Sequence, residues 1–194
     1  NPYGSSNTNL QNLTLLISFG YFMYDTIAMA YYNLLDAAMG FHHIIVCIGI
    51  YIALCSNASG AEVLGGLFVS EVSNPVMHFR LIIRSFGLRH TKIYEVSEFT
   101  YILIYIYYRL IKGIFVVYGV ASCPVGHITI RTIAVLVGIQ SYFYIYRMVN
   151  ILRNRLKDIK EREREGVKLN WFKHTIEVEK LTYYKKSLKK DGIP

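Results

Sequence analysis

The chain has 194 residues, 53% of them hydrophobic, and a mean hydropathy of +0.30. This composition excludes an ordinary soluble domain of this size and is typical of a polytopic membrane protein. The net charge is +8, but residues 147–194 hold 14 Lys and Arg against 7 Asp and Glu, so the tail carries nearly all of it. Because no nucleic-acid-binding motif accompanies this charge, the composition excludes a nucleic-acid-binding core and favours a solvated or membrane-surface tail.

The apolar stretches of the chain predict an all-α transmembrane helix bundle. A polar segment, 1–11, comes first, and its start at Asn1-Pro2 instead of a methionine indicates a processed or incomplete N-terminus. A spanning helix needs about 20 apolar residues. Five stretches near this length form a membrane domain over 12–149, and they run over residues 12–32, 40–57, 61–88, 94–119 and 127–149.

The third stretch is the least regular of the five. Asn74-Pro75 lies in its middle, and proline removes a backbone donor and clashes with the preceding turn. We therefore expect two half-helices that meet near Asn74-Pro75. The second half carries His78, Arg80 and Arg84 among apolar residues, which predicts an amphipathic helix.

The distribution of Lys and Arg predicts which ends of the helices share a side of the membrane. The segment before the fourth stretch carries Arg84, Arg89 and Lys92, and the tail after the fifth stretch is also basic. The connection between these two stretches has neither Lys nor Arg. Loops rich in Lys and Arg mark one side of a membrane. We call this the basic side, and the start of the second stretch lies on it.

Ionisable residues inside the apolar stretches are the candidate functional site. Such groups are costly at membrane depth and commonly serve a function there. Asp25 lies within the first stretch, and His42-His43 opens the second. Both lie near the basic side, so we expect a shared polar pocket open to that side, in which a carboxylate could orient an imidazole as a general base. A buried hydrogen-bonded cluster and histidines facing headgroups remain the alternatives. Adjacent histidines point in different directions on a helix, so we expect no metal site, and we expect no cofactor.

Three further residues extend the candidate site. Glu71 and Asn74 stand at the break in the third stretch, where unwound backbone needs polar partners. Arg109 is the central charge of the fourth stretch, at a depth comparable to that of Glu71. We expect Arg109 to bond a carboxylate or backbone carbonyls inside the bundle, with Glu71 as the first candidate.

The tail, residues 150–194, is expected to be helical in two parts. Nothing between Asn150 and Glu165 stops a helix, so the fifth helix should continue to about Glu165, and a second basic helix should follow over 168–190. Pairs such as Asp158 with Arg162 contribute only about 0.2–0.5 kcal/mol each, too little to order an isolated tail. An ordered tail therefore needs a second surface. We favour a partner subunit over lipid headgroups because Trp171-Phe172 offers apolar anchors.

Three segments in order along the chain resemble the TLC domain family, and more closely its TLC domain-containing protein 4 (transmembrane protein 56) subgroup. They are Gly20-Tyr21-Phe22-Met23-Tyr24-Asp25, Met39-Gly40-Phe41-His42-His43 and Phe68-Val69-Ser70-Glu71-Val72-Ser73-Asn74-Pro75. The resemblance covers about residues 12–150. It implies an all-helical membrane protein of the endoplasmic reticulum or endomembranes that handles lipids.

The chain departs from one branch of that family. Ceramide synthases, which acylate sphingoid bases from acyl-CoA, carry a His-Asp-x-x-Asp element after the histidine pair. Here the matching position is Ser70-Glu71-Val72-Ser73-Asn74, with Glu and Asn in place of two Asp. The resemblance therefore implies His42, His43 and Asp25 as candidate site residues and does not imply the acyltransferase activity.

Three functions remain open at this point. The first is non-catalytic lipid binding, sensing or homeostasis, with a lipid held by Asp25, His42, His43, Glu71, Asn74 and Arg109. The second is a non-catalytic accessory subunit of a large membrane complex, for example in the mitochondrial inner membrane, docked through residues 150–194. The third is a ceramide-synthase-like acyltransferase with His42 or His43 as the base.

Overall fold

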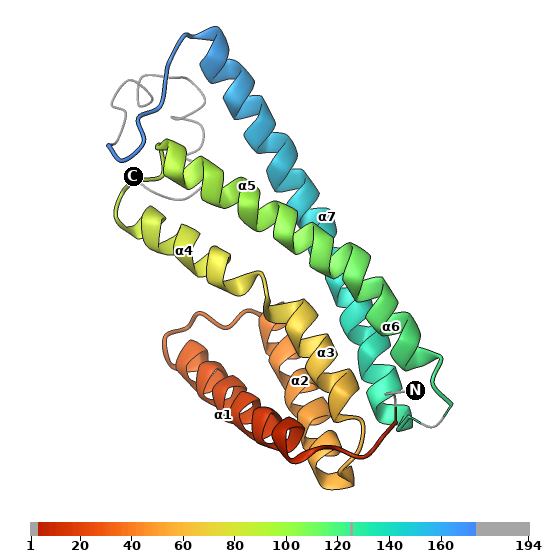
Figure 1. Ribbon diagram of the computed structural model, residues 1–194. Coiled ribbons are helices and arrows are strands. Elements are labelled where there is room, and N and C mark those ends of the chain that lie inside the picture. Colours follow the sequence, from red (N-terminus) through yellow and green to blue (C-terminus); the bar gives the residue numbers. More distant parts are fainter. Residues whose placement is uncertain (1–3, 125, 174–194) are drawn as a thin grey trace. The chain divides into compact units, whose positions relative to one another are not determined.

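The computed structural model describes residues 4–124 and 126–173 of the chain. Within these residues the protein is all-α and has no strand, as predicted. The elements in order are α1 (Asn9–Tyr31), α2 (Ala37–Ser56), α3 (Gly60–Glu71), α4 (Asn74–Ser85), α5 (Lys92–Ile106), the π-helical turn η1 (Tyr107–Lys112), α6 (Gly113–Ala121) and α7 (Ile128–Arg164) (Figure 1).

Four helical segments among the described residues are long and apolar enough to cross a membrane. They are Asn9–Tyr31, Ala37–Ser56, Lys92–Ala121 and Ile128–Arg164. The third predicted stretch is broken as expected, because α3 ends at Glu71 and α4 begins at Asn74 with Pro75 in its first turn. Each of these two helices has 12 residues. At 1.5 Å per residue each is about 18 Å long, well short of a hydrocarbon core of about 30 Å.

The chain forms two compact units. The first unit contains Asn1–Glu71 and Tyr108–Phe143, and the second contains Val72–Tyr107 and Tyr144–Pro194. In the first unit α2 packs against α1 and α3, and α3 packs against α6. The buried apolar core of this unit consists of Leu15, Phe22, Val46, Ile50, Ala53, Val120 and Ile130.

The segment before α1 is hydrogen-bonded to the residues around the turn between α2 and α3. Helix α1 begins at Asn9, three residues before the predicted start, because Thr8 and Gln11 form a reciprocal capping box. The Asn7 side chain accepts from the Gly60 backbone amide at 2.6 Å and donates to the Ala53 carbonyl at 2.8 Å. The Asn7 side chain therefore provides a hydrogen-bond partner both for a backbone amide at the start of α3 and for a backbone carbonyl near the end of α2.

The fourth predicted stretch is helical throughout but contains a π-helical turn that the sequence did not predict. A π-helical turn adds a residue to the helical repeat and is common at functional sites. A glycine follows it: a Cβ at Gly113 would lie only 3.3 Å from the Tyr108 carbonyl oxygen. The small residue thus allows the close backbone approach at the end of η1.

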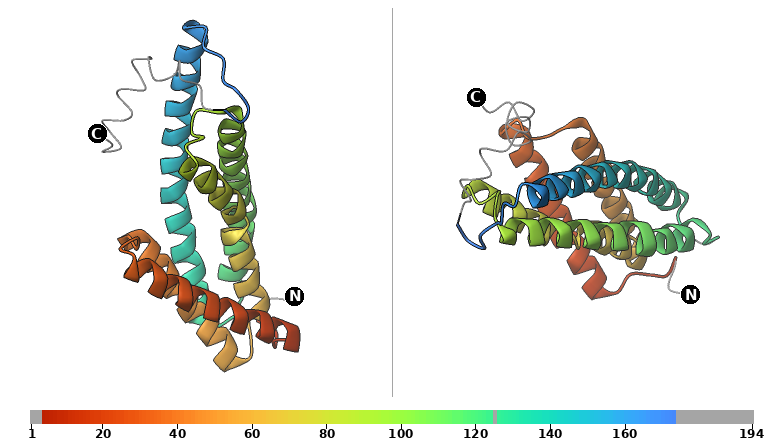
Figure 2. Two further views of the ribbon diagram at one scale, coloured as in Figure 1. Left: turned by 90° about the vertical axis from the view of Figure 1, so that its left-hand side faces the viewer. Right: turned by 90° about the horizontal axis from the view of Figure 1, so that it is seen from above.

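The second unit holds the long extension of α7 against α5. Helix α7 has 37 residues and ends at Arg164, as predicted to within one residue. Figure 2 shows it as the long helix that ends in blue. Arg155 bonds the buried Glu98 of α5, and Arg162 lies 2.6 Å from Glu95. The second surface against which this extension packs is therefore part of the same chain, and this was not predicted from the sequence.

The described chain beyond α7 turns back onto α5. The Lys92 amide donates to the Asn170 carbonyl at 2.9 Å, Leu169 is buried, and the Lys92 ammonium lies over the Trp171 ring. Residues 168–173 contain no helix. The rest of the second helix predicted over 168–190 lies outside the described residues.

Candidate functional site

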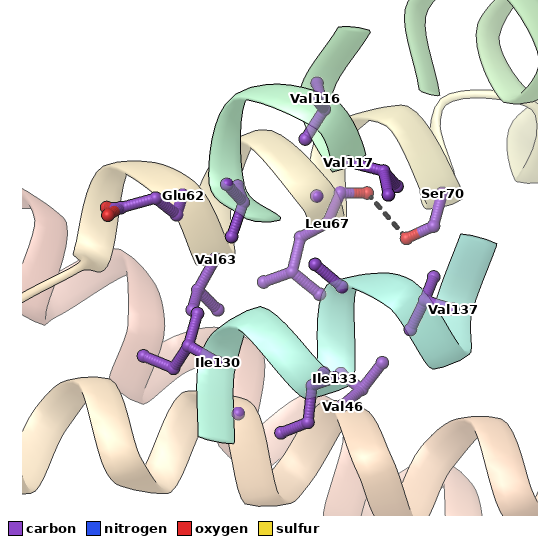
Figure 3. A pocket seen from close by; sticks show the side chains of 14 residues that line it. Val46, Glu62, Val63, Leu67, Ser70, Val116, Val117, Ile130, Ile133 and Val137 are labelled. Carbon is purple, nitrogen blue, oxygen red and sulfur yellow. Dashed lines mark hydrogen bonds between the residues drawn. The ribbon is translucent and has the colours of Figure 1, made fainter. Parts of the chain in front are cut away.

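An apolar cavity lies inside the first unit, between α2, α3, α6 and α7. Its volume is about 80 Å³. Figure 3 shows Val63 and Leu67 of α3 near Ile130 and Ile133 of α7, with Val116 and Val117 of α6 also lining the space. Among the described residues that line it, Glu62 alone is charged, and its carboxylate accepts from the Gly4 amide. A pocket so lined suits a hydrocarbon chain and not a polar ligand.

Two adjacent histidines of α2 each lie close to a carboxylate from another helix. His43 Nε2 is 3.5 Å from Asp25 Oδ2, and His42 Nε2 is 3.4 Å from Glu71 Oε1. Both histidines are buried, and the Phe22 ring meets each imidazole edge-on. The contact of Asp25 with the histidine pair was predicted from the sequence. That each histidine has its own carboxylate was not predicted.

The hydrogen bonds of Thr26 define the tautomer of His43. The Thr26 hydroxyl donates to the Phe22 carbonyl at 2.6 Å, so its single proton is engaged there. His43 Nδ1, 3.0 Å from the same oxygen, must then donate. In a neutral imidazole this leaves Nε2 without a proton, facing the Asp25 carboxyl.

Arg109 joins α3 to α7 within the same unit. It lies in η1 and donates to the Ser70 carbonyl at 2.7 Å and to the Ser141 hydroxyl at 3.1 Å. We predicted that Arg109 would bond a carboxylate or backbone carbonyls inside the bundle, and the structure shows a bond to one backbone carbonyl, that of Ser70. Its charge also acts electrostatically on the Glu71 carboxylate, the partner that the sequence favoured.

These side chains form one layer directly beside the cavity. We call it the polar layer, and its members are Asp25, Thr26, His42, His43, Glu71, Arg109 and Ser141. His42 precedes the cavity-lining Val46 by one helical turn, and Ser141 follows the cavity-lining Val137 by one turn. Glu71 adjoins Ser70, which lines the cavity itself. The apolar cavity therefore lies next to the polar layer along α2, α3 and α7.

Five of the six predicted site residues belong to the first unit and one belongs to the second. Asp25, His42, His43, Glu71 and Arg109 all belong to the first unit and come together in the polar layer. Asn74 belongs to the second unit and opens α4. The described residues hold no group of three or more His, Cys, Asp or Glu side chains arranged for a metal ion.

Three residues that contact the predicted site were not predicted from the sequence. Thr26 directly follows Asp25, so its proximity could have been inferred from the chain. Ser70 directly precedes Glu71 and could have been inferred in the same way, whereas Ser141 has no such neighbour. Serine is common in helices, and what distinguishes these two is their contact with Arg109, a tertiary feature.

The chain matches a known protein family. The sequence model of the TLC domain matches residues 2–156, which cover most of the chain and all of the polar layer and the cavity lining. No solved structure matches the chain.

Proposed function

The chain belongs to the TLC domain family, and from this membership we propose that it is a membrane protein that binds a lipid in its first unit. The hydrocarbon part of the lipid occupies the cavity between α2, α3, α6 and α7. Its polar end contacts the polar layer. The role is binding or sensing in membrane lipid homeostasis, without catalysis.

The observation that carries this proposal is the contact between the cavity and the polar layer. Lipids have one apolar and one polar end, and this arrangement offers a matching surface to each. The large exposed side chains of α1 and α2, such as Ile17, Tyr24 and Tyr51, are apolar or aromatic, as expected for helices that face lipid tails. A ligand drawn from the bilayer would therefore not need to enter water.

We also propose a subgroup and a cellular location for the chain. We place the chain near the TLC domain-containing protein 4 subgroup, on the segments that end in Asp25, His43 and Pro75, and in the endoplasmic reticulum or endomembranes. An acyltransferase is the enzymatic alternative, and the His43–Asp25 and His42–Glu71 pairs are the observation that favours it. An accessory subunit that docks through residues 150–194, for example in the mitochondrial inner membrane, is the alternative in which the fold acts as a scaffold.

Two adjacent glycines of α3 provide a matched test. Gly66 lines the cavity and Gly65 does not. A Cβ added at either position meets nothing within 4 Å. Gly66→Leu should therefore place a side chain in the cavity, and Gly65→Leu should make the same chemical change outside it. Both exchanges improve helix propensity equally, by about 1 kcal/mol or slightly less.

The experiment measures lipid that co-purifies with the full chain in mild detergent, by extraction and mass spectrometry. We expect Gly66→Leu to lower the bound lipid several-fold relative to Gly65→Leu, with similar thermal unfolding of the two variants. Equal lipid occupancy in both would refute the proposed binding site. Acyl transfer from acyl-CoA that is lost in His43→Ala would favour the enzyme, and a stoichiometric protein partner without bound lipid would favour the accessory subunit.

A further inference from the structure

The two carboxylates are the more accessible members of the polar layer. The Asp25 side chain is 33% exposed and the Glu71 side chain 27% exposed, whereas His43 and His42, their partners, are buried. Asp25 comes from α1 and Glu71 from the end of α3, so the carboxylates approach the histidines of α2 from two different helices. A molecule that reaches the layer from outside the bundle therefore meets carboxylate oxygens first.

Arg109 and His43, which supply hydrogen-bond donors to the layer, already bond acceptors within it. His43 contacts Thr26 through Nδ1 and Asp25 through Nε2. The guanidinium of Arg109 donates to a backbone carbonyl of α3 and to a hydroxyl of α7. An ionised carboxylate only accepts hydrogen bonds. The accessible part of the layer is therefore rich in acceptors, which suits a ligand that donates a hydrogen bond.

Tyr21 adds a hydroxyl group beside these carboxylates. It precedes Asp25 on α1 by four residues, about one helical turn, so the two side chains share a face of the helix. The charges of Asp25 and Glu71 both act electrostatically on the Tyr21 phenol. The Tyr21 ring also meets the Phe22 ring edge-on at 5.4 Å, and half of the residue is exposed. Because a phenol can donate a hydrogen bond, Tyr21 supplies a donor next to the accessible acceptors.

We propose that the polar end of the bound lipid is a hydroxyl group, which donates to the carboxylate of Asp25 or Glu71 and accepts from the Tyr21 hydroxyl. This inference rests on the proposed function and names the chemical class of its ligand, an uncharged lipid alcohol. A hydroxyl both donates and accepts, whereas an ammonium only donates and an ionised carboxylate only accepts. Of these three groups, the hydroxyl alone matches the carboxylates and the phenol together.

The charges of the layer favour an uncharged ligand over an amine. His43 lies 3.5 Å from Asp25, and His42 lies 3.4 Å from Glu71. The charge of Arg109 acts on Glu71 as well. Each carboxylate therefore already has a basic partner. A charge is costly to remove from water unless it is paired, so an ammonium would have to displace one of these partners. A hydroxyl adds a hydrogen bond without changing the charge of the layer.

Four probes that share one oleyl chain test the polar end of the ligand. They are oleyl alcohol, oleylamine, oleic acid and oleyl methyl ether, and the ether accepts a hydrogen bond but cannot donate one. The full chain is placed in phosphatidylcholine nanodiscs at a pH at which the acid is ionised and the amine is protonated. Each probe is added at the same mole fraction, and the bound probe is counted by native mass spectrometry.

We expect the alcohol to bind roughly tenfold better than the ether, which is the effect of one hydrogen bond to a charged acceptor. The amine and the acid should also bind more weakly than the alcohol. If the amine, the acid or the ether binds as well as the alcohol, the assignment of a hydroxyl is overturned.

Two tyrosines of α1 provide a matched pair of variants. Tyr21→Phe removes the proposed donor, and Tyr31→Phe removes an exposed hydroxyl ten residues away, about 15 Å along the same helix. We expect Tyr21→Phe to lower binding of the alcohol about fivefold, without weakening that of the amine, which cannot accept. Tyr31→Phe should leave both unchanged. Equal alcohol binding by the two variants would overturn the role of Tyr21.

The two glycine variants of α3 separate a failure of this inference from a failure of the proposed function. If Gly66→Leu and Gly65→Leu bind every probe equally, the cavity is not the binding site, and the proposed function fails together with this inference. If Gly66→Leu lowers the binding of all four probes but the wild type does not distinguish among them, the cavity site stands and the hydroxyl assignment alone fails.

Discussion

The buried carboxylate of Glu98 is predicted to be the most sensitive single position in the second unit. Its side chain is 4% exposed. It bonds Arg155 of α7, lies 3.2 Å from Arg80 of α4, and accepts from the Tyr94 hydroxyl. The exchange Glu98→Gln keeps the shape but removes the charge, so Arg155 and Arg80, whose side chains are only 13% and 21% exposed, lose their common counter-ion; Arg155 keeps only the more distant Asp158, at 3.9 Å.

Breaking a buried pair in this way costs about 3–5 kcal/mol, because an uncompensated charge remains in a poorly solvated place. For a chain of this size about 1 kcal/mol shifts the unfolding midpoint by roughly 2–4 °C, so the second unit should melt roughly 6–20 °C lower. The emission of Trp171, which lies against Lys92 in the same unit, follows this transition in detergent.

Two comparisons isolate the electrostatic cause of this loss. Glu163→Gln removes a charge from the exposed surface of α7 and should change the midpoint by about 1–2 °C or less. Adding Arg155→Met to Glu98→Gln removes one of the stranded charges and should recover part of the loss. If Glu98→Gln melts no lower than Glu163→Gln, the reasoning about this network is refuted.

Two further changes in the first unit are predicted to lower its thermal unfolding midpoint. A Cβ at Gly60 would lie 2.7 Å from Asn7 Oδ1, so Gly60→Ala should cost about 1–3 kcal/mol, whereas Gly20→Ala has open space and should stabilise α1 slightly. A higher midpoint for Gly60→Ala would contradict the close approach. Thr26→Val leaves His43 Nδ1 without its acceptor and should cost about 1–3 kcal/mol, whereas Thr26→Ser keeps the hydroxyl and should melt near the wild type. Equal midpoints for these two exchanges would show that the hydroxyl is unimportant.

Local chemistry explains why much of the helix layout could be predicted. The length of the apolar stretches gave the spanning helices, and Pro75 marked the break between α3 and α4. The Thr8–Gln11 capping box, which moved the start of α1, also lies within four consecutive residues. It could have been recognised from the sequence, because such boxes depend on neighbours along the chain and not on tertiary contacts.

The candidate site was predictable in its residues but not in its pairing. The cost of burying an ionisable group singled out Asp25, His42, His43, Glu71 and Arg109, because that cost follows from residue type and depth alone. Which histidine meets which carboxylate depends on how α1 and α3 pack on α2. Side-chain packing selects between pairings in which the ionisable groups lie at the same depth. The spacing of these residues along the chain does not determine which pairing forms.

The sequence by itself determined that this chain is an all-helical membrane protein of the TLC type, where its helices lie, and that α7 continues beyond the apolar stretch. Only the tertiary structure decided what orders that extension: Glu95 and Glu98 of α5 bond Arg162 and Arg155 across more than 50 residues of chain. Only it placed the apolar cavity beside the polar layer. The physical reason is the same in both cases, because apolar length and helix propensity act locally, whereas ion pairs and cavities depend on groups that the fold brings together.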